Sequence, residues 1–93
     1  MLAVIDNGSI FTPEITMVLL KNNTQNSVIP FQQITKKDLC KFDSFILSGR
    51  RKNEKKMNAL NSEIIKHAVF EKKSLLGICY GAEILALTLG GTI

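Results

Sequence analysis

The sequence is poor in the residues on which disulfide-rich, metal-binding and nucleotide-binding proteins depend. Its 93 residues include two cysteines, one histidine and no tryptophan. Two cysteines, Cys40 and Cys79, are too few for a disulfide framework, and no histidines and cysteines recur at the spacing of a metal site. The phosphate-binding patterns G-x-x-x-x-G-K and G-x-G-x-x-G are also missing. We therefore expect neither a bound metal nor any other cofactor.

Long apolar runs are missing as well. No stretch approaches the roughly 20 apolar residues that a membrane-spanning helix needs. The apolar run at residues 2–5 is too short for the core of a signal peptide, and it is followed by Asp6. We therefore expect a cytoplasmic protein that makes no membrane contact and keeps both thiols reduced.

The chain carries a modest excess of positive charge. Lysine and arginine outnumber the acidic residues 12 to 8, which gives a net charge of +4. Much of the excess lies in the run Arg-Arg-Lys-Asn-Glu-Lys-Lys at residues 50–56. Such a run could contact phosphate groups or RNA, but no aromatic residues are interleaved with it to stack on bases. A solvated loop leading into a helix is the favoured interpretation, so we expect no specific nucleic-acid partner.

Apolar runs and helical patterns alternate along the whole chain. Hydrophobic residues make up 45% of it, so a small core can form. The short apolar runs are typical of buried strands, and the segments between them show helical spacing or helix-start signals. The predicted strands are residues 2–5, 27–31, 44–47 and 75–78. The predicted helices are residues 12–22, 55–70 and 80–89, and residues 36–41, capped by Thr35, are predicted to form a turn or half a helix. The alternation predicts an α/β fold, an open parallel sheet of about four strands with helices on both faces.

The predicted elements give a first interpretation of four further residues. Asp6 and Asn7 follow the first strand, where they could line a ligand site, but hydrogen bonds within their own turn are the favoured role. Cys40 has no partner motif, so we expect it to pack. His67 is the only internal candidate for a base to Cys79. It lies in the middle of a predicted helix, away from the strand ends, so a half-exposed helix histidine is the favoured interpretation.

The last fifth of the chain carries the strongest chemical signal. Gly77 and Gly81 stand two residues before and after Cys79, which is the spacing of a nucleophile elbow between a strand and a helix. A nucleophile at such a turn needs neighbours without a Cβ atom, and the following helix directs its dipole at the sulfur and favours the thiolate. The N–H of Tyr80 would be placed to bind an oxyanion. A cysteine after an apolar strand is also typical of a small buried hydrophobic residue.

Three segments together resemble class I glutamine amidotransferases. The segment Gly-Ile-Cys-Tyr-Gly at residues 77–81 is similar to the nucleophile elbow of this family. The segment Phe-Ile-Leu-Ser-Gly at residues 45–49 resembles the family's strand and Ser-Gly-Gly turn, and Ala-Val-Ile-Asp-Asn-Gly at residues 3–8 resembles its first strand and loop. The three follow one another in the family's order and cover most of the chain. Within the family, the glutaminase subunit of GMP synthase is the most similar.

The resemblance implies both a fold and a reaction. The fold is a flavodoxin-like sheet, and the reaction is hydrolysis of glutamine through a γ-glutamyl thioester on Cys79, with the ammonia supplied to a synthetase subunit or domain. The resemblance also implies an oxyanion hole and substrate contacts. The oxyanion-hole positions are Tyr80, Arg50 and Gly49, and the substrate positions are Glu83 and Gly81.

Two positions depart from the family's pattern. Arg50 stands where the family carries the second glycine of its Ser-Gly-Gly turn. If that position needs a positive φ, an arginine costs about 1–2 kcal/mol there. Glu83 stands where the family usually carries glutamine. A carboxylate beside the thiol would discourage the thiolate and change the hydrogen-bond donors offered to the substrate.

The resemblance covers residues 1–93 as one small domain, which corresponds to the first half of the family's domain. The family's catalytic base and its orienting carboxylate, a His-x-Glu pair, would lie beyond Ile93. We therefore expect the 93-residue chain alone to be inactive. A non-catalytic interaction module with the same fold is the alternative. A cysteine hydrolase or chaperone-like protein of similar sheet topology is a third hypothesis, which the Ser-Gly at residues 48–49 and the Gly-Gly at 90–91 disfavour.

The predicted helix at residues 80–89 is apolar nearly all round. Such a helix is normally buried on two sides, and in a half-domain one of those sides has nothing to pack against. One side is formed by Ala82, Leu85, Ala86 and Leu89, and the other by Ile84 and Leu87. We therefore expect the chain to self-associate through this helix and through an exposed edge of the sheet.

Overall fold

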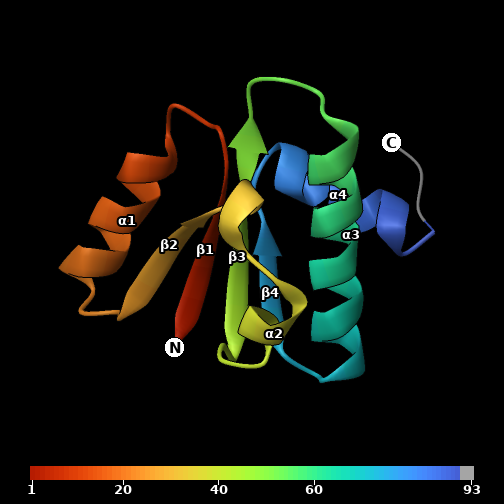
Figure 1. Cartoon of the computed structure of the whole chain (residues 1–93). Coiled ribbons are helices and arrows are strands. Elements are labelled where there is room, and N and C mark those ends of the chain that lie inside the picture. Colours follow the sequence, from red (N-terminus) through yellow and green to blue (C-terminus); the bar gives the residue numbers. More distant parts are fainter. Residues whose placement is uncertain (91–93) are drawn as a thin grey trace.

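Four parallel strands form an open sheet at the centre of the molecule. The computed structural model describes residues 1–90 and places the strands in the order β2-β1-β3-β4 (Figure 1). The strands are β1 (Leu2–Asn7), β2 (Asn26–Pro30), β3 (Ser44–Arg50) and β4 (Ser74–Gly77). Each pair of neighbouring strands is parallel. The predicted open parallel sheet is confirmed.

Helices flank the sheet on both faces. In the part of the chain that the structure describes they are α1 (Thr12–Lys21), the 3-10 turn η1 (Phe31–Gln33), α2 (Lys36–Leu39), α3 (Lys55–Phe70) and α4 (Tyr80–Thr88). Strand β2 lies outside β1, and β4 lies outside β3 on the opposite side (Figure 1). Since parallel crossovers are right-handed, α1 and α3 must cover opposite faces.

The main core lies between the sheet and α3. Alternate residues of a strand point to the same face, and on this face Ala3, Ile5, Phe45 and Leu47 are buried. Helix residues complete the cluster, namely Phe31, Leu39, Met57, Ile64, Ile65, Ala68, Tyr80 and Ile84. Burial of this apolar surface is the main force that fixes α3 and α4 on the sheet.

The opposite face of the sheet is covered less completely. Val4 and Ile46 are buried there, whereas Leu76 of the edge strand β4 is more than half exposed. On α1, which covers this face, Val18 is exposed. Apolar surface therefore remains open between α1 and β4.

Two strands extend beyond their predicted ends. Strand β1 continues to Asn7 and β3 continues to Arg50, because the two residues still pair with each other in the sheet. The prediction of a turn at Ser48 and Gly49 was therefore wrong, since both belong to β3. Pro30 ends β2, an edge strand, which is a position where a sheet tolerates proline.

The short helix α2 ends at Leu39, and Cys40, the residue that follows it, does not pack. The N–H of Thr35 donates a 3.0 Å hydrogen bond to the carboxylate of Asp38, as in a capping box. Leu39 is buried in the core, and the next residue, Cys40, is exposed. The prediction that Cys40 packs was wrong, because Leu39 fills the inward-facing position of this turn.

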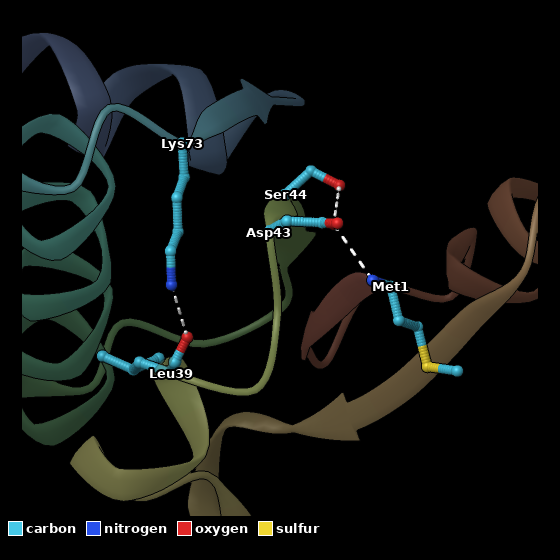
Figure 2. A network of polar contacts seen from close by, with 5 residues as sticks. All are labelled: Met1, Leu39, Asp43, Ser44 and Lys73. Atoms are coloured by element: carbon cyan, nitrogen blue, oxygen red, sulfur yellow. Dashed lines mark hydrogen bonds and ion pairs between the residues drawn. The ribbon is translucent and has the colours of Figure 1, made fainter.

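Polar contacts fix the amino ends of the strands (Figure 2). The Nζ of Lys73, just before β4, donates a 3.1 Å hydrogen bond to the carbonyl oxygen of Leu39. The ammonium group of Met1 lies 3.1 Å from the carboxylate of Asp43, which precedes β3. These contacts join the start of β4 to α2 and the start of β1 to the start of β3.

Candidate active site

Cys79 lies at a strained turn between β4 and α4. Its backbone angles are φ 54° and ψ −112°, and among the residues described only Asn23 and Lys72 share a positive φ without being glycine. Such a conformation costs a residue with a side chain about 1–3 kcal/mol and is concentrated at functional sites. The side chain of Cys79 is exposed. The alternative interpretation of Cys79 as a small buried hydrophobic residue is therefore wrong.

The two glycines of the elbow are required by close backbone contacts. A Cβ atom on Gly81 would overlap the carbonyl oxygen of Leu47, and one on Gly77 would lie 2.5 Å from the backbone of Gly81. The N–H of Ile78 donates a 3.0 Å hydrogen bond to the same Leu47 oxygen. The first turn of α4 therefore sits directly on β3, at a distance that only glycine permits.

Cys79 faces a cavity at the carboxyl ends of the strands. The cavity has a volume of about 960 Å³. It is bounded by the loop after β1, by α1, by the end of β3 and by the elbow. The lining residues are Ser9, Ile10, Phe11, Glu14, Ile15, Val18, Gly49, Arg50, Arg51, Ile78, Cys79, Tyr80 and Glu83. Apolar walls with a few polar and charged side chains are typical of a small-molecule site.

A bulge brings the end of β3 up to the elbow. Ile5 pairs with Leu47 and Asn7 pairs with Arg50, so β3 contains one residue more than β1 between these pairs. Bulges of this kind redirect a strand and are common beside active sites. A Cβ atom on Gly49 would lie 3.5 Å from the Cβ of Cys79. The extra residue therefore places the Gly49 backbone against the Cys79 turn.

A buried polar network supports this bulge. The N–H of Asn7 donates to Ser48 Oγ (2.8 Å), and its side-chain Nδ2 donates to the Ser48 carbonyl (3.1 Å). Ser48 Oγ in turn donates to the carbonyl of Gly49 (2.9 Å). Asn7 Nδ2 also donates to Asn61 Oδ1 on α3 (2.9 Å). The prediction that Asn7 bonds within its own turn was wrong, whereas Asp6 does accept a bond from the nearby N–H of Gly8.

Arg50 and Tyr80 meet beside the thiol. The guanidinium carbon of Arg50 lies 4.2 Å from the centre of the Tyr80 ring. Burial raises the pKa of the Tyr80 phenol above its ordinary 10.0, and the positive charge of Arg50 opposes this rise. Arg50 adopts no positive φ, because the bulge carries it as an extended residue of β3. The backbone penalty expected for an arginine at this position therefore does not arise.

The structure brings five of the six residues predicted for the site to one cavity. They are Cys79, Tyr80, Arg50, Gly49 and Glu83. The sixth, Gly81, is buried against β3 and does not line the cavity. Its close contact with the β3 backbone gives it a packing role.

His67 lies far from Cys79. Its Nε2 is 2.9 Å from Lys73 Nζ, and its ring packs edge-on against Phe45. Lys73 precedes β4 and Cys79 follows its end, so about 13 Å of strand separates the two, at roughly 3.3 Å per residue. A general base must lie within about 3.2 Å of the proton it takes. His67 is therefore a half-buried helix histidine, in agreement with its interpretation from the sequence.

Residues 1–90 contain no cluster of the usual metal-binding side chains. Among them, no group of three or more histidine, cysteine, aspartate and glutamate side chains is placed to hold a metal ion. Within the same residues, no helix has both the length and the apolar character needed to cross a membrane.

Two parts of the site were missed from the sequence. One is the wall formed by α1, including Ile15 and Val18, whose position depends on the order of the strands in the sheet. The alternation of strands and helices in the sequence does not specify that order. The polar network was missed because Asn7 and Asn61 are 54 residues apart. A signal for it existed, since Asn61 lies four residues after Met57 and three before Ile64, which is the helical spacing of the buried side of α3.

Comparisons with known proteins agree with this geometry. The family model for class I glutamine amidotransferases matches residues 3–93. A solved protein from Thermoplasma acidophilum, described as a component of GMP synthase, is 28% identical with a TM-score of 0.76, and the match covers 96% of this chain and 44% of that one. A glutamine amidotransferase from Methylobacillus flagellatus is 16% identical with a TM-score of 0.71, covering 97% and 38% respectively, and supports the fold. No curated protein gives a significant match. The chain thus spans less than half the length of either solved protein.

Proposed function

Because the chain belongs to the class I glutamine amidotransferase family, as its motifs predicted, we propose that Cys79 is the nucleophile of a glutaminase site. The observation that carries the proposal is the elbow itself. An exposed thiol stands in a strained conformation at the first turn of a helix and faces a cavity. Residues held in such a conformation at a cavity are typically functional. Helix α4 begins at Tyr80, so its N-terminus lies at the Cys79 turn, where it can stabilise negative charge that develops on a bound substrate.

In the proposed reaction, the Sγ of Cys79 attacks the side-chain amide carbon of glutamine. The S–C bond forms, the C–N bond breaks, and the amide nitrogen leaves as ammonia with the proton given up by the thiol. Water then adds to the thioester carbon, which releases glutamate and returns a proton to the sulfur. The N–H groups of Tyr80 and of the Gly49–Arg50 segment would hold the charge that develops on the carbonyl oxygen. The ammonia would pass to a synthetase subunit or domain.

We also propose that the 93-residue chain does not turn over glutamine by itself. Its only histidine is His67, which lies at the opposite end of β4 from Cys79. A thiol without its base keeps little acyl-transfer power. Ammonia release should therefore match that of Cys79→Ser in a sensitive coupled assay. Release by the unsubstituted chain that Cys79→Ser abolishes would contradict this proposal.

Alkylation at mildly acidic pH tests the nucleophile directly, with Cys40 as an internal control. Both cysteines are exposed, so a difference in rate reports the surroundings of the sulfur rather than its accessibility. We expect iodoacetamide to modify Cys79 at least about tenfold faster than Cys40, as read from peptide masses. A glutamine analogue with a chloromethyl ketone in place of the amide should label Cys79 alone, and free glutamine should slow that labelling. Equal rates at the two cysteines would overturn the assignment.

A non-catalytic interaction module is the alternative function. Two observations favour it, namely the arginine at the glycine position of β3 and the distance of His67 from the elbow. The same experiment separates the hypotheses, because a module of this kind has no reason to bind glutamine beside Cys79. Labelling of Cys79 that glutamine does not slow would support the module.

A further inference from the structure

The side chains of Arg50, Asn58 and Tyr80 join the three elements that surround the elbow. The hydroxyl of Tyr80, on α4, donates a 2.6 Å hydrogen bond to Asn58 Oδ1 on α3. The Nη1 of Arg50, at the end of β3, donates to the same oxygen at 3.1 Å. The guanidinium also stacks over the Tyr80 ring. We call these three residues the Arg50–Asn58–Tyr80 clamp.

A second asparagine fixes the clamp from the loop side. Arg50 Nη1 donates to Asn53 Oδ1 at 3.0 Å, and Asn58 Nδ2 donates to the same oxygen at 3.1 Å. Asn58 therefore uses its oxygen as an acceptor for Arg50 and Tyr80 and its nitrogen as a donor to Asn53. Asn53 and Asn58 accept hydrogen bonds from the Arg50 guanidinium, and the Tyr80 ring lies against its plane, so the guanidinium is held in one orientation. Only arginine carries the rigid planar fork of donors that this arrangement uses.

The clamp connects the two residues that the proposed glutaminase site needs at fixed positions. Cys79 lies directly before Tyr80, and Gly49, against the Cys79 turn, lies directly before Arg50. A side chain that merely filled space at position 50 would need no polar partners on α3. Here the guanidinium contacts Tyr80 and Asn58 at once, and both Arg50 and Tyr80 line the cavity of the thiol.

We propose that the Arg50–Asn58–Tyr80 clamp is a positioning device that fixes the backbone N–H groups of Arg50 and Tyr80 relative to the Cys79 thiol. Arg50 and Asn58 are then positioning residues of the oxyanion-binding site, and the arginine replaces by side-chain contacts the loop geometry that a glycine would supply. This inference rests on the proposed function, since it presumes that an oxyanion forms beside Cys79.

The first test detects the clamp contacts through the titration of Tyr80. Tyr80 is the only tyrosine and the chain has no tryptophan, so the ultraviolet absorbance of the phenolate form reports on this side chain alone. Arg50→Met removes the nearby positive charge and should raise the pKa of the Tyr80 phenol further, because a cation favours the phenolate. Arg51→Met removes the same charge from the neighbouring residue and should leave the phenol titration unchanged. An unchanged titration in Arg50→Met would overturn the clamp.

The second test separates oxyanion binding from thiol reactivity. Acylation of Cys79 by p-nitrophenyl acetate forms the S–C bond, expels nitrophenolate and passes through an oxyanion, whereas alkylation by iodoacetamide forms no oxyanion. Removal of one oxyanion donor typically slows acyl transfer by about 10²–10³-fold, and displacement of a donor should cost less. We expect Asn58→Leu, which removes no charge from beside the thiol, to slow acylation about tenfold and to leave the alkylation rate unchanged. Parallel loss of both rates would overturn the positioning role.

Asn58→Asp is the conservative variant that should retain the acylation rate that Asn58→Leu loses. It keeps the oxygen that accepts from Arg50 and Tyr80 and loses only the donor to the exposed Asn53, so acylation should stay within about twofold of the unsubstituted chain. Loss of acylation in Asn58→Asp equal to that in Asn58→Leu would contradict the clamp. Failure of the proposed function gives a different result, because Cys79 of the unsubstituted chain would then be acylated no faster than Cys40. That result would overturn the positioning role too, while the Tyr80 titration would still report the clamp contacts.

Discussion

The side-chain amides of Asn7 and Asn61 exchange hydrogen bonds with each other inside the protein. Asn7 Nδ2 donates to Asn61 Oδ1 at 2.9 Å, and Asn61 Nδ2 donates to Asn7 Oδ1 at 2.8 Å. Both residues are buried. The pair joins the end of β1 to α3 directly beneath the bulge that carries Gly49, so it links the stability of the fold to the shape of the site.

Replacement of Asn61 by leucine should therefore destabilise the protein despite its similar size. The substitution leaves Asn7 Oδ1 without its donor, and one buried unsatisfied polar group costs about 1–3 kcal/mol. Urea unfolding should show a loss of that size in the free energy of unfolding. Gln25→Ala removes an amide from an exposed position and should change stability by less than about 0.5 kcal/mol. If the Asn61→Leu variant is as stable as the unsubstituted chain, a water molecule donates to Asn7 Oδ1 in place of Asn61 Nδ2.

Alanine at Gly81 should disrupt the elbow far more than alanine at Gly49. The added methyl group would overlap the backbone carbonyl of Leu47, which cannot move without breaking β3. Overpacking typically costs about 1–3 kcal/mol, and more where backbone must shift. At Gly49 the nearest atom to the new Cβ would be 3.5 Å away, an ordinary contact. Thermal unfolding of both variants checks this, and equal melting temperatures would contradict the close packing of α4 on β3.

The sequence predicted the elements of this fold well because each is specified locally. The helix at residues 55–70 and the start of α4 at Tyr80 match the structure, since the apolar spacing and the elbow glycines lie within each segment. The extension of β3 to Arg50 could not be predicted in this way. It depends on the pairing of Arg50 with Asn7 of a neighbouring strand, and pairing across the sheet leaves no periodic signal in either segment.

The same reason explains why the elbow of the candidate site was predicted from the sequence and the side-chain contacts around it were not. Cys79 and its two glycines are neighbours in the chain, so their spacing carries the elbow geometry. The stacking of Arg50 on Tyr80 and their shared acceptor Asn58 involve three separate elements. The sequence indicated only that Arg50 departs from the family's glycine and thus suggested a backbone penalty, whereas the bulge in β3 removes that penalty by changing the residue's conformation.

Exposed leucines on α4 and β4 should cause the chain to self-associate. Leu87 and Leu89 on or just after α4 are 52% and 57% exposed, and Leu76 on the edge strand β4 is 56% exposed. Apolar groups beside an unpaired strand edge favour association, and a lysine there opposes it. Sedimentation velocity should show dimers or larger species, and Leu76→Lys with Leu87→Lys should shift them towards monomer.

The control for association is a lysine elsewhere on the surface. Leu20 on α1 is 75% exposed, so Leu20→Lys makes the same chemical change away from β4 and α4. Its sedimentation should match that of the unsubstituted chain. A compact monomer for the unsubstituted chain at all concentrations would refute the predicted association.

The capping box of α2 should contribute to stability in a pH-dependent way. Hydrogen bonds from the backbone N–H and the hydroxyl of Thr35, and then one from Lys41, lower the pKa of the Asp38 carboxyl below 3.8. Because the folded value is lower than the unfolded one, this contribution is present above pH 3.8 and is lost as the pH falls through the folded pKa. Asp38→Asn should therefore flatten the acid side of the stability curve measured by urea unfolding. An acid side as steep as before would show that the capping box contributes nothing there.

The strain at Cys79 predicts that glycine is a more stabilising residue than alanine at position 79. Glycine adopts φ 54° without the cost of about 1–3 kcal/mol that a side chain incurs, but it loses roughly 0.5–1 kcal/mol through its freer unfolded chain. Cys79→Gly should therefore be about 1 kcal/mol more stable than Cys79→Ala in urea unfolding. The same pair at Cys40, which has an ordinary helical φ of −68°, should give the opposite order. If alanine is preferred at both positions, the elbow is not strained, and the main physical argument for Cys79 as a nucleophile is lost.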